Sequence, residues 1–392
     1  MDIRLKERII KYLDVHREEI ISISDKIHSN PEPGFREYFA VETLTEALTR
    51  GGFAVQRGIA GLETAFRAEF EGRAAGPKVA FIAEYDALPE LGHGCGHNLI
   101  GAASVGAALA LSQVLDKLGG TMVVLGSPAE ETGGGKVTLV EQGVFQDIAV
   151  AMMVHPADRF TVDVSSLAMD ALEFTFYGKS AHAAASPHDG RNALEGVIQL
   201  FNSLNALRPY LKDGVRINGI ISEGGQAPNI IPARAVARFY VRAKKRTILE
   251  DVLERVLACA RGAAEATGTR VEWYNYEPSY DNMVTNRELA RVFQDSLFSL
   301  GVSQVAEGKA GMGSLDMGNV SRVVPAIHPY VAIGPLGLAA HTPEFAQAAA
   351  DRTGHQGLMI GAKALALTAL EVLQKPHVLR KIREEFAQKI KS

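Results

Sequence analysis

The chain has 392 residues, which is long for one hydrophobic core, so two domains are expected. It is 47% hydrophobic and 22% charged, proportions that are ordinary for a globular enzyme. The net charge of −4 and the lack of any block of Lys and Arg argue against a nucleic-acid partner. Two cysteines, Cys95 and Cys259, are too few for a disulfide framework and fit a reducing compartment.

The N-terminal 28 residues place apolar side chains at helical spacing with charges between them, which predicts an amphipathic helix. This stretch lacks the unbroken apolar core and the small-residue cleavage site of a signal peptide. No run of about 18 apolar residues occurs in the sequence, so no membrane span is predicted. We therefore expect a cytoplasmic protein.

The next part of the chain alternates strands with a helix. A charge-poor segment rich in Ala, Leu and Gly, Asn98–Leu115, predicts a helix buried on most sides. Four segments have the pattern of strands, and these are Glu63–Phe70, Lys78–Ala83, Thr121–Leu125 and Ile148–Val154. Such alternation predicts an α/β domain with a mostly parallel central sheet.

The pattern changes after about residue 168. The segments that follow read as strand, helix, two strands, helix and strand, over Ala171–Tyr177, Arg191–Leu207, Val215–Ser222, Ala235–Arg242, Thr247–Thr267 and Val271–Tyr276. This β-α-β-β-α-β order predicts a ferredoxin-like α+β domain.

The α/β pattern then resumes with a predicted helix at Asn286–Leu300, a strand at Tyr330–Ile333 and a long buried helix at Gly354–Leu373. A charged last stretch, Pro376–Lys391, predicts an exposed helix. We therefore expect a catalytic domain of residues 1–168 and 286–392, with residues 169–285 inserted as a second domain.

Candidate metal ligands follow the first buried strand. Cys95 and His97 are separated by one glycine, which allows a tight turn that lets both side chains converge. Thiolate and imidazole both bind zinc and similar metals. Asp86 lies between this turn and the strand, and we expect it to serve catalysis by holding a ligating imidazole or thiolate in orientation.

Two adjacent carboxylates, Glu130 and Glu131, follow the strand Thr121–Leu125. Neighbouring side chains of an extended segment point to opposite sides, so one can bind metal while the other faces the substrate. We assign Glu131 as the ligand and Glu130 as the general base.

Two histidines complete the predicted set. His155 ends the strand at Ile148–Val154, and His341 lies in a loop before the last long helix. Together with Cys95, His97 and Glu131 they exceed what one tetrahedral zinc needs, and they suit two divalent cations about 3.5–4 Å apart. The thiolate favours zinc, while the His and Glu ligands would also hold manganese or cobalt.

Motifs along nearly the whole chain resemble the M20 metallopeptidase family, which includes aminoacylases, carboxypeptidases and auxin-conjugate hydrolases. The resemblance rests on HSNPEPGFREYFAVETL, EYDALPELGHGCGHNLIG, SPAEETGGGK, MMVHPA, GKSAHAAASPHDGRNALEG, GGQAPNIIPA, GSLDMGNVSRVVPAIHPY and HTPEF. Many members carry His-x-Asp where this chain has Glu84-Tyr85-Asp86. The Cys-Gly-His motif is typical of the auxin-conjugate-hydrolase-like branch.

The resemblance implies that the inserted domain is a lid that also forms a homodimer. It implies a catalytic role for His182, which would assist the substrate carbonyl oxygen. It further implies substrate contacts for Asn229, Arg242 and His328, and places Asp316 along the site.

The sequence therefore predicts a hydrolase that cleaves the amide bond of a small dipeptide or N-acyl amino acid with metal-activated water. The resemblance makes β-alanyl or other basic dipeptides one candidate substrate class. The alternatives are an aminobenzoyl-glutamate hydrolase and a metal-dependent aminohydrolase of an aromatic amine. A binding protein with a structural metal site is disfavoured, because such a site needs no base.

Overall fold

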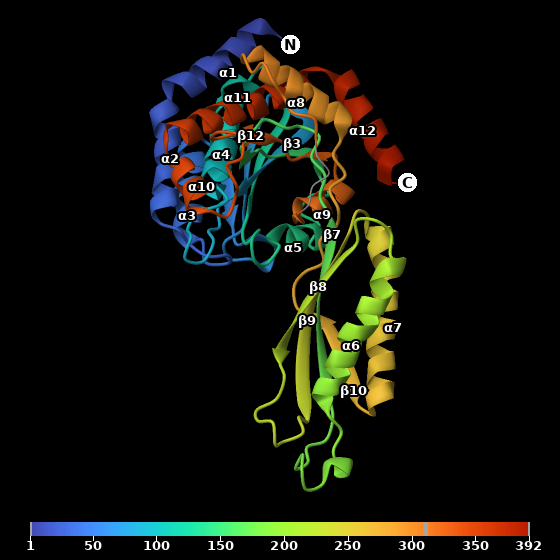
Figure 1. Ribbon diagram of the computed structural model, residues 1–392. Coiled ribbons are helices and arrows are strands. Elements are labelled where there is room, and N and C mark those ends of the chain that lie inside the picture. The colour runs from blue at the N-terminus through green and yellow to red at the C-terminus, as the bar shows by residue number, and fades with distance from the viewer. Residues whose placement is uncertain (1, 309–312, 391–392) are drawn as a thin grey trace. The chain divides into compact units, whose positions relative to one another are not determined.

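The computed structural model describes residues 2–308 and 313–390. The chain forms two compact units, shown in Figure 1. Unit 1 comprises Met1–Ser165, Met283–Gly311 and Leu315–Ser392, and unit 2 comprises Ser166–Asn282 and Met312–Ser314. The main divisions fall after residues 165 and 282, where the sequence pattern placed them after 168 and 285.

A six-stranded sheet forms the centre of unit 1. Its strands in spatial order are β1 (Ala54–Arg57), β2 (Phe66–Glu71), β4 (Gly119–Ser127), β3 (Ala74–Glu84), β5 (Ile148–Met152) and β11 (Ala326–Ile327). The pairs β3–β4, β3–β5 and β5–β11 are parallel, whereas β1–β2 and β2–β4 are antiparallel. The expected α/β fold with a mostly parallel sheet is confirmed. The antiparallel edge was not predicted.

Alternate residues of β3 enter two different hydrophobic clusters. Val79, Phe81 and Ala83 belong to the larger cluster, which also contains much of helix α4 (His97–Leu115). Ala80 and Ile82 belong to the smaller cluster on the other face of the sheet. Because successive strand side chains point to opposite faces, this run is apolar at every position and the sheet is buried on both sides.

Helices cover the sheet of unit 1. Helix α4 packs against β3 and β4 and is flanked by α1, α2 and α11. The helices of this unit are α1 (Ile3–Val15), α2 (Arg17–Ser29), α3 (Tyr38–Arg50), α4, α5 (Gly135–Glu141), α8 (Arg287–Ser299), α9 (Met317–Val323), α10 (Pro343–Ala348), α11 (Arg352–Gln374) and α12 (Pro376–Ile390). A short parallel pair, β6 (His155–Ala157) with β12 (Tyr330–Ala332), completes the unit.

Three expectations about helices were incomplete. The predicted N-terminal helix is two helices, which meet at His16. Helix α12 is not simply exposed, because Val378, Leu379 and Ile382 are buried. Helices α4 and α11 are long and apolar enough to cross a membrane, but 94% and 72% of their apolar windows are buried inside the protein, so they are weak evidence of a span.

Unit 2 contains a four-stranded antiparallel sheet with two helices. Its order along the chain is β7 (Ala168–Tyr177), α6 (Ala193–Leu207), β8 (Arg216–Glu223), β9 (Arg234–Ala243), α7 (Arg246–Thr267) and β10 (Arg270–Asn275). The spatial order is β10-β7-β9-β8, which is the expected ferredoxin-like arrangement. Helices α6 and α7 pack on one face over Phe174, Phe176 and Phe239.

Candidate metal centre

The predicted ligands lie where the strands of the central sheet end. Cys95 precedes α4 and His97 is its first residue, while Glu131 follows β4. His155 begins β6, just after β5. His341 lies between β12 and α10, and its backbone N–H donates to the Gly94 carbonyl oxygen at 2.8 Å. Ends of parallel strands are the usual place for a site in an α/β fold.

Three overlapping groups of side chains could each hold a metal ion. They are Cys95 with His97 and His155, Cys95 with Glu131 and His341, and His97 with Glu130 and Glu131. Within each group the ligand atoms lie within 4.8 Å of one another. All five predicted ligands therefore come together, and Cys95 is shared by two of the groups.

Individual distances agree with this convergence. The Cys95 Sγ lies 3.6 Å from the His155 Nε2, whose ring presents this atom because the Nδ1 is 2.8 Å from the Pro156 carbonyl oxygen. The Glu131 Oε1 lies 3.4 Å from the His341 Nε2 and 3.8 Å from the His97 Nε2. Sulfur, imidazole and carboxylate ligands at such separations suit zinc or a similar divalent ion.

Several buried polar atoms at this point have no hydrogen-bond partner among the described residues. They are the Glu84 Oε2, the His97 Nε2 and the Glu131 Oε1. A buried polar atom without a partner is costly, and each of these atoms is a metal-binding type. The residues present therefore fit a centre of divalent cations.

Gly96 is required for the Cys-Gly-His turn. Its φ is +75°, a left-handed conformation that side chains rarely adopt. A Cβ there would lie 2.8 Å from the Pro156 Cγ. Burial raises the pKa of the Cys95 thiol, so a bound cation would be needed to hold it as a thiolate.

Asp86 bridges two predicted ligands. One carboxylate oxygen lies 2.9 Å from the His97 Nδ1, and the other accepts the Glu131 backbone N–H at 3.0 Å. The carboxylate thus fixes the imidazole so that the His97 Nε2 faces the centre. This is the geometry by which an outer carboxylate orients a metal-binding histidine.

We expect Asp86→Asn to weaken divalent-metal affinity by about 10–100-fold, the usual effect of losing such an outer partner. Metal titration of the chelator-treated protein measures it. The exposed Asp116, at the end of α4, supplies the control Asp116→Asn, which should bind metal as the wild type does. Unchanged affinity in Asp86→Asn would contradict the orienting role.

Glu130 and Glu131 lie in a turn, so the expectation of an extended segment with opposed side chains was wrong. Ala129, just before them, has a φ of +57°, and its N–H donates to a carboxylate oxygen of the buried Glu37 at 2.8 Å. Its carbonyl accepts from the N–H groups of Gly133 and Gly134. This turn brings both carboxylates to His97.

Glu130 has the environment of a proton carrier. Burial raises its pKa well above the usual value, and the nearby carboxylates of Asp316 and Glu84 raise it further. A raised pKa brings a carboxylate closer to the range in which it can accept and return a proton at neutral pH.

A buried lysine beside the centre was missed in the sequence. The Lys136 Nζ lies 2.6 Å from the Glu84 Oε1 and 2.8 Å from the Asp316 Oδ1, and all three side chains are buried. Burial alone would lower the pKa of Lys136, but these two carboxylates raise it. The one sequence signal was a lysine inside an otherwise apolar stretch, Gly135–Val140.

His328 is also in unit 1, whereas the predicted lid residues are in unit 2. The His328 ring is buried 5.2 Å from the His155 ring. In unit 2 the His182 Nδ1 accepts from the Ala185 N–H at 3.1 Å, and the Asn229 carbonyl accepts from the Ala183 N–H at 3.0 Å. The Arg242 guanidinium, on β9, lies 4.9 Å from the Tyr240 ring.

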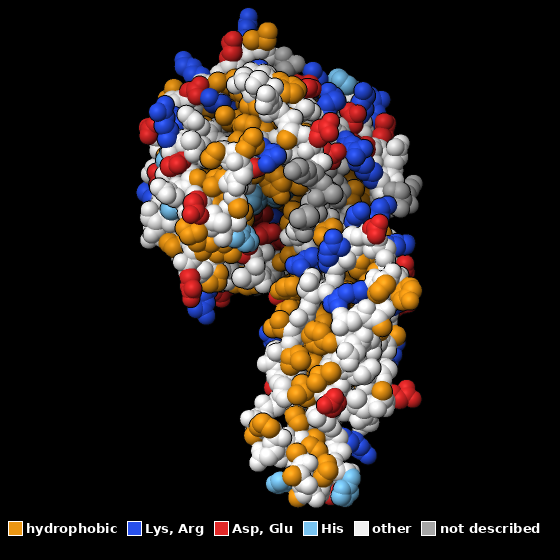
Figure 2. Space-filling model, viewed as in Figure 1, with side chains coloured by type: hydrophobic (Ala, Val, Ile, Leu, Met, Phe, Trp, Pro, Cys, Tyr) orange, Lys and Arg blue, Asp and Glu red, His pale blue; other side chains and the backbone are white. Residues whose placement is uncertain are grey.

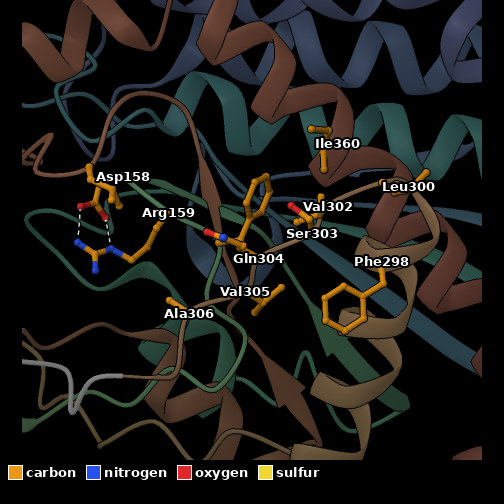
Figure 3. A pocket seen from close by; sticks show the side chains of 13 residues that line it. Asp158, Arg159, Phe298, Leu300, Val302, Ser303, Gln304, Val305, Ala306 and Ile360 are labelled. Carbon is orange, nitrogen blue, oxygen red and sulfur yellow. Dashed lines mark hydrogen bonds and ion pairs between the residues drawn. The ribbon is translucent and has the colours of Figure 1, made fainter.

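A separate cavity of about 940 Å³ in unit 1 is shown in Figure 3. Apolar side chains such as Phe160, Phe298 and Val305 line it, with the ion pair of Asp158 and Arg159 at one side. Its lining residues include none of the predicted ligands. The Asp158 Oδ2 accepts the Gly337 N–H at 2.9 Å, so this cavity borders the loop that leads to His341.

Comparisons with known proteins agree with the fold and the site. Residues 169–267 match the peptidase dimerisation domain. The chain is 39% identical to a Xaa-Arg dipeptidase of Mus musculus, over 98% of this chain and 93% of that protein. It is 28% identical to one of the proteins that form the p-aminobenzoyl-glutamate hydrolase of Escherichia coli strain K12, over 96% of this chain and 93% of that protein.

A solved structure has the same fold. A dinuclear metal-binding peptidase of the M20 family from Bacillus subtilis superposes with a TM-score of 0.71 at 21% identity, over 92% of this chain and 99% of that one. The ligand cluster within this fold defines the class of metal-dependent amidohydrolases. The chain belongs to the M20 family of metallopeptidases. The family resemblance and the expected enzyme class are confirmed.

Proposed function

We propose that this enzyme hydrolyses the peptide bond of small dipeptides with the help of two divalent cations. The observation that carries the proposal is the set of three overlapping ligand groups with Glu130 among them. Similarity to a Xaa-Arg dipeptidase over nearly the whole chain supports dipeptides with a basic C-terminal residue as the preferred class. N-acyl amino acids are the next class, because they present the same amide bond.

In this proposal five residues hold the cations. These are Cys95, His97, Glu131, His155 and His341. When bound, the cations would polarise the substrate carbonyl and lower the pKa of water. The thiolate supports zinc as the metal, with manganese and cobalt as alternatives.

The protein's own groups then move the proton. Glu130 takes a proton from the attacking water and returns it to the leaving amine. Asp86 keeps the His97 ring in place throughout. His182 of unit 2 is proposed to donate to the oxyanion, and Asn229, Arg242 and His328 to contact the substrate.

The test is a substrate panel on chelator-treated enzyme reloaded with zinc, manganese or cobalt. It contains dipeptides ending in Arg or Lys, dipeptides with acidic or apolar ends, N-acyl amino acids, aminobenzoyl-glutamate and aromatic amines. We expect the metal-free enzyme to be inactive and the reloaded enzyme to prefer basic dipeptides. Deamination of an aromatic amine without amide cleavage would overturn the proposal, while preference for aminobenzoyl-glutamate would reassign the substrate.

We also propose that unit 2 forms a homodimer. The match to the peptidase dimerisation domain supports this assembly. Strand β8 is at the edge of its sheet, and its Ile220 and Ile221 are exposed. Figure 2 shows hydrophobic side chains exposed along this unit. An unpaired apolar strand edge favours pairing with another chain.

A further inference from the structure

Glu84 ends β3 and has one unpartnered carboxylate oxygen at the metal centre. Its side chain is 1% exposed. The Oε1 is held by Lys136 at 2.6 Å, but the Oε2 has no hydrogen-bond partner among the described residues. The His97 Nε2 lies 3.6 Å from this second oxygen, which is too far for a hydrogen bond.

The three unpartnered atoms face a common point. The His97 Nε2 lies 3.6 Å from the Glu84 Oε2 and 3.8 Å from the Glu131 Oε1. His97 cannot donate from this nitrogen while it also binds a cation, because a metal-binding imidazole nitrogen carries no proton. A carboxylate oxygen left with neither a proton donor nor a cation would be strongly destabilising in the interior.

Glu84 stays ionised although it is buried. Burial raises the pKa of its carboxyl, but the charge of Lys136 and the nearby His97 lower it to about 2. Lys136 is in turn fixed by Asp316, which accepts from both its ammonium at 2.8 Å and its backbone N–H at 3.1 Å. The carboxylate is therefore held in one orientation, with its free oxygen directed to His97.

We infer that Glu84 is a sixth metal-binding residue of the centre, and that Lys136 and Asp316 are positioning residues for it. The inference rests on the proposed pair of cations. It adds an oxygen ligand on the side of His97, where the predicted set supplied only His97 and the carboxylates after β4. An added oxygen ligand of this kind widens the range of divalent ions that the centre can hold.

The test compares metal binding by the wild type, Glu84→Gln and the control Glu71→Gln. Glu71 ends the neighbouring strand β2 and is exposed. Chelator-treated protein is titrated with zinc, and the cobalt-loaded protein is examined by visible absorption. We expect Glu84→Gln to weaken one of the two sites by at least about 10-fold and to shift the cobalt bands, because the loss of even an outer partner weakens binding about 10–100-fold.

Thermal unfolding of the metal-free proteins separates binding from a merely structural role. A structural role predicts a lower midpoint for metal-free Glu84→Gln with wild-type metal affinity and an unchanged cobalt spectrum. That result overturns the inference. If Glu84→Gln does not fold, Glu84→Asp keeps the charge for Lys136 but withdraws the oxygen by one methylene, and wild-type affinity there is equally contradictory.

Failure of the inference is distinguishable from failure of the proposed function. A wild type that binds two cations with Glu84-dependent affinity, but cleaves no amide of the panel, would refute the proposed function and keep the metal assignment. A wild type that cleaves dipeptides while Glu84→Gln binds both ions normally would do the reverse.

Discussion

Glu130→Gln is expected to keep its full metal content and to lose at least about 10²-fold in kcat, the scale of lost general-base catalysis. Glutamine has nearly the same volume and can still donate and accept hydrogen bonds, but it cannot take a proton from water. Glu130 is buried among Glu84, Glu131 and Asp316, which raises its pKa, and no other described carboxylate in this cluster is assigned to proton transfer. Metal analysis and steady-state kinetics on the preferred dipeptide measure the two quantities.

The neighbouring residue provides the matched control. Glu131→Gln should instead lower metal content, because the Glu131 Oε1 lies within 3.4 Å of the His341 Nε2 and 3.8 Å of the His97 Nε2. If fully loaded Glu130→Gln turns over near the wild-type rate, Glu130 is not the base. If both variants lose metal equally, the division of roles between the two carboxylates is wrong.

Lys136→Met is expected to destabilise the metal-free protein by about 3–5 kcal/mol, the cost of removing one partner from a buried ion pair. Methionine fills similar space, so the loss reports the charge rather than a cavity. It leaves Glu84 and Asp316 buried without the ammonium that lies within 2.8 Å of each. Denaturant unfolding followed by far-ultraviolet circular dichroism measures the change.

Two features of the molecule shape this experiment. The one tryptophan, Trp273, lies on β10 of unit 2, so its fluorescence would report the other unit. Bound metal would add its own stabilisation, so both proteins are compared without it. Lys117→Met, at an exposed lysine, should change stability by under about 0.5 kcal/mol. A loss for Lys136→Met no larger than that would contradict a charge-paired role.

The secondary structure that the sequence predicted best is the most strongly patterned. The continuous apolar runs of β3, β4 and β5 and the split pattern of unit 2 were predicted because burial on one or both faces fixes their residue types. Strand β1 was missed, since its four residues are mostly exposed and have no apolar period. The antiparallel direction of β2 depends on its pairing with β4, which no local pattern encodes.

The candidate site follows the same division. Cys95, His97, Glu131 and His155 were found because they directly follow recognisable strands or a glycine turn. The side-chain directions of Glu130 and Glu131 were wrong, because Ala129 takes a left-handed turn in place of an extended path.

Long-range pairing explains the other omission. The role of Lys136 was missed because its partners, Glu84 and Asp316, are far from it in sequence and are joined only by the fold. Asp316 was expected only to line the site.

The clamp between Lys136 and Asp316 also sets the order in which a newly made chain can assemble. Asp316 emerges from the ribosome 180 residues after Lys136, and all of β7 to β10 is synthesised in the interval. Until then Lys136 lacks one of its two counter-charges, and β5 lacks its neighbour β11. The inserted unit, whose contacts are largely its own, can therefore finish folding while the half of the protein that surrounds it in sequence is still waiting for its C-terminal pieces.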